Sequence, residues 1–148
     1  MCGAARARAR SVAPLGPLSA AQADITDDAA IAALELGAGA ELVTISYCLT
    51  MIPAWKEALE KIVSKVLAPG GFLALVDFTV KDGAAGTAEQ GVLRRWFALD
   101  GVFFDRAHVD WLESRLTTTF YHESAARVPY TPLYPTHYIF VGRKPTLA

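Results

Sequence analysis

The sequence predicts an α/β fold, in which a partial sheet of parallel strands ends in an antiparallel hairpin at its carboxyl-terminal edge. Residues 42–47 form a short run rich in β-branched and aromatic side chains, and a segment with helical spacing of apolar residues begins at Pro53. A Pro-Gly-Gly corner then leads into a second apolar run at residues 72–78. A strand, a crossover helix and a strand of similar hydrophobicity form a βαβ unit, so the two strands are expected to be parallel and buried on both faces.

The segment that begins at Pro53 predicts an amphipathic helix that packs on the sheet. One side of it carries the apolar residues Trp55, Leu59, Ile62, Val63, Val66 and Leu67. The other side is mostly lysine and glutamate. Pro53 lies near the first turn, where it loses only an amide that would be unpaired in any case. Residues 68–71, Ala-Pro-Gly-Gly, are expected to end the helix because proline cannot continue it and glycine accepts left-handed geometry.

The second half of the chain predicts two more helices and the last two strands. The first of these helices carries four apolar residues on one side: Val92, Leu93, Trp96 and Phe97. Asp105 is expected to cap the second helix. Residues 117–122 and 137–141 have the composition of strands and are separated by a proline-rich loop at residues 128–135. These two strands form the predicted hairpin at the edge of the sheet.

Length, charge and hydropathy limit the class of protein. The chain has 148 residues and a hydrophobic fraction of 53%, which suits one domain with one core. Residues 1–17 are expected to be a disordered or atypical start, and residues 18–148 to form the domain. A net charge of −1 gives no basic field, so no nucleic-acid partner is predicted. No apolar segment reaches the roughly 20 residues of a membrane-spanning helix, so any contact with a membrane would be peripheral.

Cysteine and histidine positions predict neither a disulfide nor a metal site. Cys2 and Cys48 are far apart in the sequence, which favours free thiols in a reducing compartment. His108, His122 and His137 are scattered without the spacing of metal ligands.

Several segments of the chain resemble one family. Residues 67–75 resemble the Leu-x-Pro-Gly-Gly-x-Leu segment that leads into the fifth strand of class I S-adenosylmethionine-dependent methyltransferases. Residues 46–55 are similar to the segment after the fourth strand in the methyltransferase part of betaine lipid synthases. Further similar segments are residues 76–78, 95–97, 128–133 and 138–144. The resemblance implies a Rossmann-like methyltransferase sheet, of which residues 18–148 would form the carboxyl-terminal part.

The resemblance implies an activity as well as a fold. It implies N-methylation of a diacylglyceryl homoserine headgroup, with S-adenosyl-L-methionine as cofactor, to give a trimethylated betaine lipid. Such an enzyme would work in the cytoplasm, or peripherally at the endoplasmic reticulum or the bacterial inner membrane. Methyl transfer from a sulfonium requires an aligned, neutral amine rather than a nucleophilic side chain. Accordingly, no Ser/His/Asp arrangement with persuasive spacing is found.

The candidate site lies where the two parallel strands end, because ligands of such sheets bind at the carboxyl ends of strands. Ser46 and Tyr47 are the candidate catalytic residues, expected nearest the sulfonium and the incoming amine, and packing at a strand end is the alternative. Both are also candidate cofactor-binding residues, and so is Met51. This interpretation requires the two strands to run in the same direction and to share a crevice that bulky apolar groups do not fill.

The rest of the cofactor site is less complete in the sequence. Residues 20–27 resemble the end of the third strand of the family, where Asp24 would contact the adenine amino group beside Ile25. The alternative is that Asp24 caps a helix. The Gly-rich loop that binds the cofactor is not identified. Residues 35–40, Glu-Leu-Gly-Ala-Gly-Ala, have a similar composition but lead into a strand instead of following one, which favours a flexible turn.

Three residues are candidates for binding the substrate. Arg95, beside Arg94, belongs to a region that covers the active site in related enzymes, and it would meet a carboxylate or phosphate headgroup. Ordinary solvated charge is the alternative. Tyr130 and Tyr134 would line one side of a substrate pocket, and the alternative is that they pack over the edge of the sheet.

Two other functions remain open from the sequence. One is methylation of a different small molecule. The other is a catalytically inactive fragment that binds a headgroup or a partner chain, since a sheet without its first strands exposes an edge that an upstream half or a partner would complete.

Overall fold

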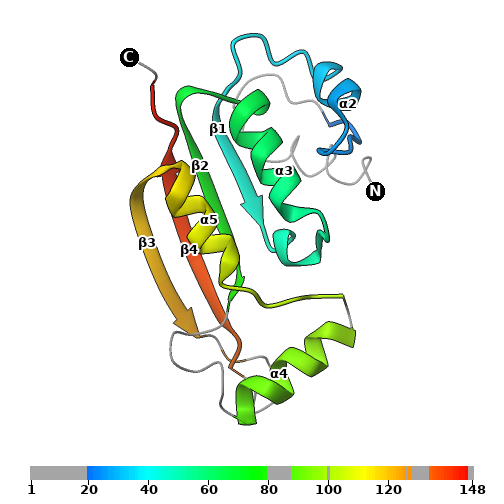
Figure 1. The fold of residues 1–148 in the computed structure, drawn as a ribbon, viewed down its shortest axis with the longest axis vertical. Coiled ribbons are helices and arrows are strands. Elements are labelled where there is room, and N and C mark those ends of the chain that lie inside the picture. The colour runs from blue at the N-terminus through cyan, green and yellow to red at the C-terminus, as the bar shows by residue number, and fades with distance from the viewer. Residues whose placement is uncertain (1–19, 80–87, 100, 126, 128–133, 147–148) are drawn as a thin grey trace, which may run out of the picture.

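The computed structural model describes residues 20–79, 88–99, 101–125, 127 and 134–146. Its elements along the chain are α2 (Asp28–Ala32), β1 (Ala40–Ser46), the 3-10 turn η1 (Leu49–Met51), α3 (Trp55–Lys61), the π-helical turn η2 (Ile62–Val66), β2 (Leu67–Thr79), α4 (Ala88–Leu99), α5 (Ala107–Arg115), β3 (Thr117–Ala125) and β4 (Thr136–Arg143). The four strands form one sheet in the order β1-β2-β4-β3 (Figure 1). No helix of the described residues is long and apolar enough to span a bilayer.

The direction of the strands agrees with the predicted fold. β1 pairs with β2 in parallel, with Leu42 opposite Phe72 and Ser46 opposite Val76. β4 lies antiparallel between β2 and β3, so the last two strands form a hairpin at the edge of the sheet. The partial α/β sheet with an antiparallel carboxyl-terminal hairpin is therefore confirmed. It places the carboxyl ends of β1 and β2 side by side.

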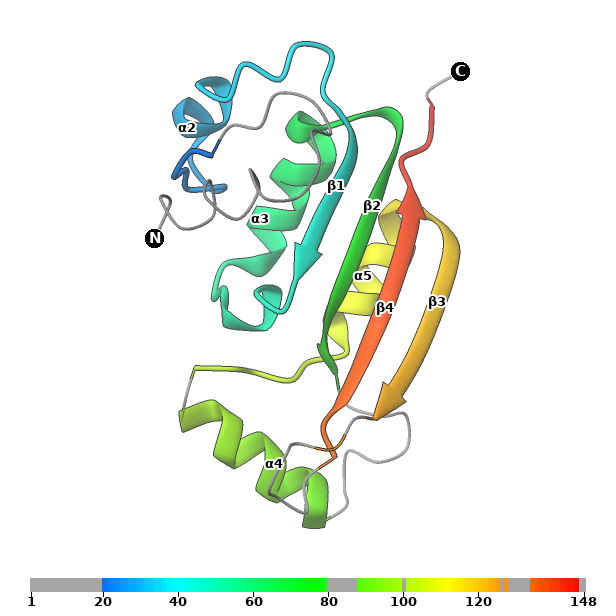
Figure 2. The same cartoon turned by 180° about the vertical axis from the view of Figure 1, so that it is seen from behind.

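The core lies between one face of the sheet and helices α3 and α5, which cover the same face (Figures 1 and 2). Its buried side chains are Ile45, Leu49, Leu59, Ile62, Leu67, Leu73, Leu75, Val109, Leu112, Leu116, Tyr138 and Phe140. Figure 2 shows the opposite face, which no helix of the described residues covers. Exposed apolar side chains on that face come from all four strands: Leu42, Phe72, Ile139 and Phe120. The predicted burial of the parallel strands on both faces is thus observed on one face only.

The predicted helical stripe packs on the sheet as expected, except for its last member, Leu67, which belongs to β2. Leu59, Ile62 and Val66 are buried, and Trp55 and Val63 pack against the same core. The regular helix α3 ends at Lys61. The π-helical turn η2 then completes the segment before β2 begins.

The Pro-Gly-Gly corner does not lie between the helix and the strand as predicted. β2 already begins at Leu67, which pairs with Ala40, while Leu42 pairs with Phe72, so the corner forms a bulge within the strand pair. A Cβ atom on Gly71 would lie 3.0 Å from the Ala40 carbonyl oxygen. Glycine is thus needed here for the close approach of β1, in addition to any role in ending the helix.

The apolar stripe predicted for α4 is only partly buried. Phe97 packs against Phe104 and Phe78, whereas Val92 and Trp96 are exposed. Asp105 Oδ1 accepts a hydrogen bond from the first amide of α5, at 2.9 Å from Ala107 N, but the N-cap position itself is Arg106, one residue later than predicted. The remaining member of the stripe, Leu93, has no described side chain.

Candidate functional site

The carboxyl end of β1 carries a strained backbone. Tyr47 has a φ of 47°, in the left-handed region that costs a non-glycine residue about 1–2 kcal/mol. Its amide donates to Val76 O at 2.8 Å, which fixes the end of β1 against β2. Its ring lies 5.1 Å from the ring of Phe78 and remains 44% exposed. Strain of this kind persists where the surrounding structure holds it and is typical of functional sites.

A buried carboxylate at the end of β2 holds the loop that follows Tyr47. Asp77 Oδ2 accepts hydrogen bonds from Leu49 N at 2.6 Å and Thr50 N at 3.2 Å. Its Oδ1 accepts from Thr50 Oγ1 and from Phe78 N, each at 2.8 Å. Leu49 and Thr50 supply the first amides of η1, which have no partner within a helix. Asp77 therefore caps η1 from a neighbouring strand. Asp77 was not among the predicted site residues, and its signal in the sequence was an acid inside an apolar run.

Three polar groups lie buried among the core residues. Tyr138 pairs with Asp77 across the sheet, and its hydroxyl has no hydrogen-bond partner among the described residues. The same holds for His108 Nδ1 and Thr79 Oγ1. Burial, and then the charge of Asp77, raise the pKa of Tyr138, so its hydroxyl stays protonated. These three groups are buried donors and acceptors that ordered water would satisfy.

Lowering the pH is expected to destabilise the protein through His108. Burial beside the Trp55 ring lowers the pKa of His108 below its ordinary value, although Asp105 and Asp77 act in the opposite direction. Below about pH 6.5 the unfolded chain then binds more protons than the folded chain, so the free energy of unfolding falls. Urea unfolding of His108→Gln between pH 7.5 and 5.5 should show a smaller loss than the wild type. His122→Gln, at an exposed position, is the control that should keep the full loss.

Aromatic rings occupy the space beyond the end of β2. The ring of Phe78 lies 5.3 Å from that of Phe104 and 5.5 Å from that of Phe97, and the latter two are 5.0 Å apart. Phe104 is buried among them. Apolar rings therefore occupy the predicted crevice beside β2, against the requirement that bulky apolar groups leave it open, while the end of β1, with Ser46 and Tyr47, is exposed. Any reaction site at this edge lies on the side of β1.

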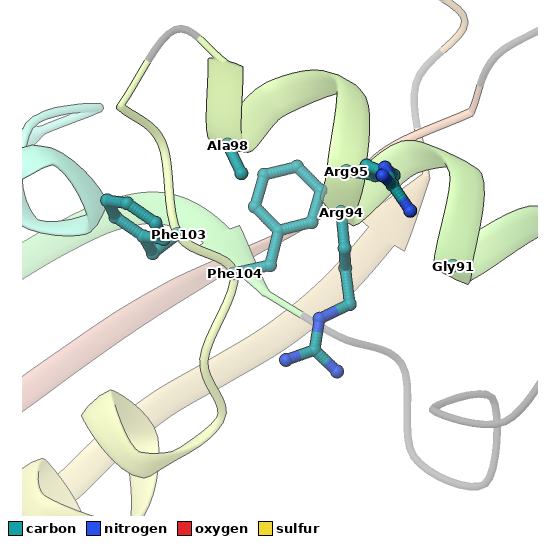
Figure 3. A pocket seen from close by; sticks show the side chains of 6 residues that line it. All are labelled: Gly91, Arg94, Arg95, Ala98, Phe103 and Phe104. Atoms are coloured by element: carbon teal, nitrogen blue, oxygen red, sulfur yellow. The ribbon is translucent and has the colours of Figure 1, made fainter.

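A pocket of about 390 Å³ lies beside this aromatic cluster. It is lined by Gly91, Arg94, Arg95, Ala98, Phe103 and Phe104 (Figure 3). Gly91 has no side chain and Ala98 has only a methyl group, so there is room between α4 and the segment that follows it. In Figure 3 the Arg94 side chain runs past the Phe104 ring, and Arg95 points in a different direction. Phe103 N donates to Thr50 O at 3.0 Å, which joins the pocket wall to the loop that Asp77 holds.

The structure brings some of the predicted site residues together. Ser46 and Tyr47 are consecutive at the end of β1, and the exposed Met51 ends η1 on the loop that follows. Arg95 lines the pocket, which connects to Tyr47 through the contacts of Phe78 and Phe104.

The other predicted residues lie apart from this group or outside the described chain. Tyr134 is exposed just before β4. Tyr130 falls outside the described residues. Ile25 packs on the core from the segment before α2. Arg94, which was not among the predicted site residues, lines the same pocket as Arg95.

The turn around Asp24 differs from the capping alternative. Asp24 Oδ1 accepts from Thr26 N at 2.9 Å and from Thr26 Oγ1 at 2.8 Å, and these bonds lower its pKa. The residue that caps α2 is Asp27, which accepts from Ala29 N at 2.9 Å. The interpretation of Asp24 as the cap is therefore wrong, because the helix starts one turn later than that interpretation needs. Residues 35–39 lie in the connection from α2 to β1, as the turn interpretation predicted, and Ala40 is the first residue of β1.

Comparisons with known proteins establish the fold. No protein-family model and no curated protein matches the sequence. Among solved structures, a putative methyltransferase from Bacillus halodurans C-125 matches with a TM-score of 0.74 at 14% identity, over 98% of this chain and 79% of that chain. The N-methyltransferase NodS from Bradyrhizobium japonicum WM9, in complex with S-adenosyl-L-homocysteine, matches with a TM-score of 0.63 at 18% identity, over 98% of this chain.

A third match is the magnesium protoporphyrin IX methyltransferase ChlM from Synechocystis PCC 6803, with bound S-adenosylhomocysteine, at a TM-score of 0.60 and 18% identity over 97% of this chain. The present chain spans 63% of the length of NodS and 59% of that of ChlM. The chain thus has the sheet architecture found in S-adenosylmethionine-dependent methyltransferases.

Proposed function

We propose that residues 18–148 are the carboxyl-terminal part of an S-adenosylmethionine-dependent N-methyltransferase that acts on a diacylglyceryl homoserine-type lipid headgroup. The observation that carries this proposal is the parallel pair of β1 and β2, whose carboxyl ends meet at one edge with the strained Tyr47 exposed. Ligands of open α/β sheets bind at such edges. Bound S-adenosylhomocysteine in NodS and ChlM, which share the fold, supports the choice of cofactor.

The residues around Asp24 would suit the adenine end of the cofactor. Asp24 Oδ1 is held by Thr26, which leaves Oδ2 without a partner among the described residues. Because the pKa of Asp24 is lowered, this oxygen is charged at neutral pH and suits an adenine amino donor. Ile25 would offer an apolar contact beside it, and Met51 would contact the cofactor from the loop after β1. When bound, S-adenosylmethionine supplies an electrophilic methyl group on a sulfonium.

The chain's own contribution to the reaction is positioning. The amine must be neutral, and its lone pair must point at the methyl group. The Ser46 and Tyr47 hydroxyls would accept hydrogen bonds from the amine and so orient that lone pair. Asp77 keeps the following loop in place through its bonds to Leu49 and Thr50.

The headgroup would be held by charge. Arg94 and Arg95 line the pocket and make no ion pair with another described residue, so they suit the carboxylate of an amino-acid headgroup. Tyr134 is exposed and, with Tyr130, would provide an aromatic wall for the substrate. Methylation of another small anionic amine would use the same groups.

A second candidate is a catalytically inactive binding fragment. Within the described part of the chain, no glycine-rich loop follows a strand and opens a helix, so the methionine end of the cofactor has no assigned residues. β1 is also an edge strand whose outer side pairs with no described strand. A partner chain or an upstream half that completes the sheet would use this edge.

Calorimetric titration with S-adenosylhomocysteine tests the proposal. The enzyme predicts saturable binding, and Asp24→Asn should weaken it about tenfold or more, because the amide keeps an acceptor for Thr26 but turns a donor toward the adenine amino group. Asp110→Asn, at an exposed position on α5, is the matched control and should bind as the wild type does. Absence of binding by the folded wild-type chain would favour the inactive fragment.

A further inference from the structure

We propose that α4 lies in the surface of an anionic lipid bilayer, with one apolar row of its side chains entering the headgroup region. The row consists of Val92, Trp96 and Leu99, which are 60%, 61% and 84% exposed. We call it the α4 row. This inference goes beyond the proposed function, because binding to a bilayer requires no methyl transfer.

Helical spacing puts the α4 row on one face. Positions i, i+4 and i+7 of a helix lie one above the other, so the three side chains form a continuous stripe. The other faces of α4 have different neighbours. Phe97 packs against Phe104, and Gly91, Arg94 and Ala98 line the pocket. The α4 row is therefore a largely exposed face of the helix, whereas Phe97 and the pocket-lining side of α4 face other described residues.

The position of α4 suits contact with a flat surface. Figures 1 and 2 show α4 at one end of the molecule, beyond the carboxyl ends of β1 and β2. The pocket opens beside the same helix. A bilayer that contacts the α4 row would thus bring lipid headgroups next to the pocket.

Charge complementarity favours an anionic lipid surface. Arg95 is exposed and forms no ion pair with another described residue, whereas Arg94, two positions after Val92, lies on the opposite side of the helix from the α4 row. Arg95 lies one turn before Leu99, at the border of the α4 row, where its guanidinium would reach the headgroups while its apolar stem stays in contact with lipid. The sequence of α4 contains these two arginines and a single acid, Glu89. Basic residues near an anionic bilayer each strengthen binding about fivefold.

The composition of the α4 row fits a bilayer better than a protein partner. A tryptophan and aliphatic side chains bordered by arginine are typical of helices that lie in the membrane interface. A stable protein interface uses about 20–30 residues on each side, far more than this stripe provides. The uncovered face of the sheet, which includes Phe120, is a wider apolar surface than the α4 row and would suit a protein partner better.

Vesicle binding tests the proposal directly. The full chain should co-sediment with vesicles of phosphatidylcholine and phosphatidylglycerol more strongly than with phosphatidylcholine alone. The double variant Val92→Ser/Leu99→Ser should bind at least tenfold more weakly, since two large apolar groups no longer enter the lipid. Arg95→Gln should lose about fivefold of the preference for phosphatidylglycerol, together with part of the salt dependence, whereas Arg94→Gln, on the opposite side of α4, should keep both. Brominated lipids should quench tryptophan emission in the wild type and much less in Trp96→Phe.

Phe120→Ser is the matched control, because Phe120 is 51% exposed and belongs to β3, not to the α4 row. It should bind vesicles as the wild type does. The proposal is overturned if the wild type does not bind, if Phe120→Ser weakens binding as much as the double variant, or if the α4 row is instead required for self-association in ultracentrifugation. Val92→Ser/Leu99→Ser should keep its affinity for S-adenosylhomocysteine, so failure of this proposal is distinguishable from failure of the methyltransferase proposal.

Discussion

Asp77→Ala is expected to lower the free energy of unfolding by about 3–5 kcal/mol. The carboxylate is fully buried and accepts four hydrogen bonds, three of them from Leu49 and Thr50 in the loop after β1. Its removal leaves buried donors without acceptors, and each such donor costs about 1–3 kcal/mol unless water reaches it. Urea unfolding followed by circular dichroism measures the change.

Asp77→Asn separates the charge from the shape. Its amide nitrogen cannot accept from the loop, so we expect a loss of about 2 kcal/mol, together with weaker binding of S-adenosylhomocysteine in the folded protein. Asp110→Asn removes an exposed carboxylate on α5 and should change the free energy of unfolding by less than about 0.5 kcal/mol. If Asp77→Ala unfolds at the same urea concentration as Asp110→Asn, the carboxylate does not hold this loop.

Asp77 and Tyr47 act on the same stretch of backbone. Tyr47 is in a left-handed conformation, and the next residues are fixed by the hydrogen bonds to Asp77. A strained residue is retained only when its neighbours determine its conformation. The acid on β2 therefore contributes to the exposed position of the Tyr47 ring, although Asp77 itself is buried.

Local patterns in the sequence were sufficient to predict the parallel pair. The β-branched run of β1, the helical stripe from Trp55 to Val66 and the apolar run of β2 each depend on residues close together in the chain. Short βαβ connections bring such strands together in parallel, so the local signals determine the topology. The antiparallel hairpin followed for the same reason from two strand-like runs.

Long-range contacts were not predictable in this way. The bonds of Asp77 to Thr50 join residues 27 positions apart, and no spacing in the sequence indicates them. The bulge at the Pro-Gly-Gly corner depends on how closely β1 approaches Gly71. The rings of Phe78 and Phe104 meet only because the chain returns to the end of β2 after α4. Packing between distant segments decides such features, so the site was predicted only as far as its strand ends.

Gly39→Ala is expected to destabilise the protein by about 3 kcal/mol. Gly39 has a φ of 96°, which costs any L-residue about 1–2 kcal/mol. A Cβ atom here would lie 2.9 Å from Ala68 N and 3.1 Å from Val66 O, so backbone rather than a flexible side chain would have to move. Chemical denaturation measures the loss.

Gly37→Ala is the matched control, because Gly37 also has a positive φ, of 58°, but has nothing within 4 Å of the added methyl group. It should cost only about 1 kcal/mol. The pair also tests what the glycines of residues 35–40 are for. If they serve the turn before β1, Gly37→Ala keeps its affinity for S-adenosylhomocysteine. If this stable variant loses the ligand, the segment is the cofactor loop after all, since a methyl group in open space changes ligand contacts more than it changes the fold.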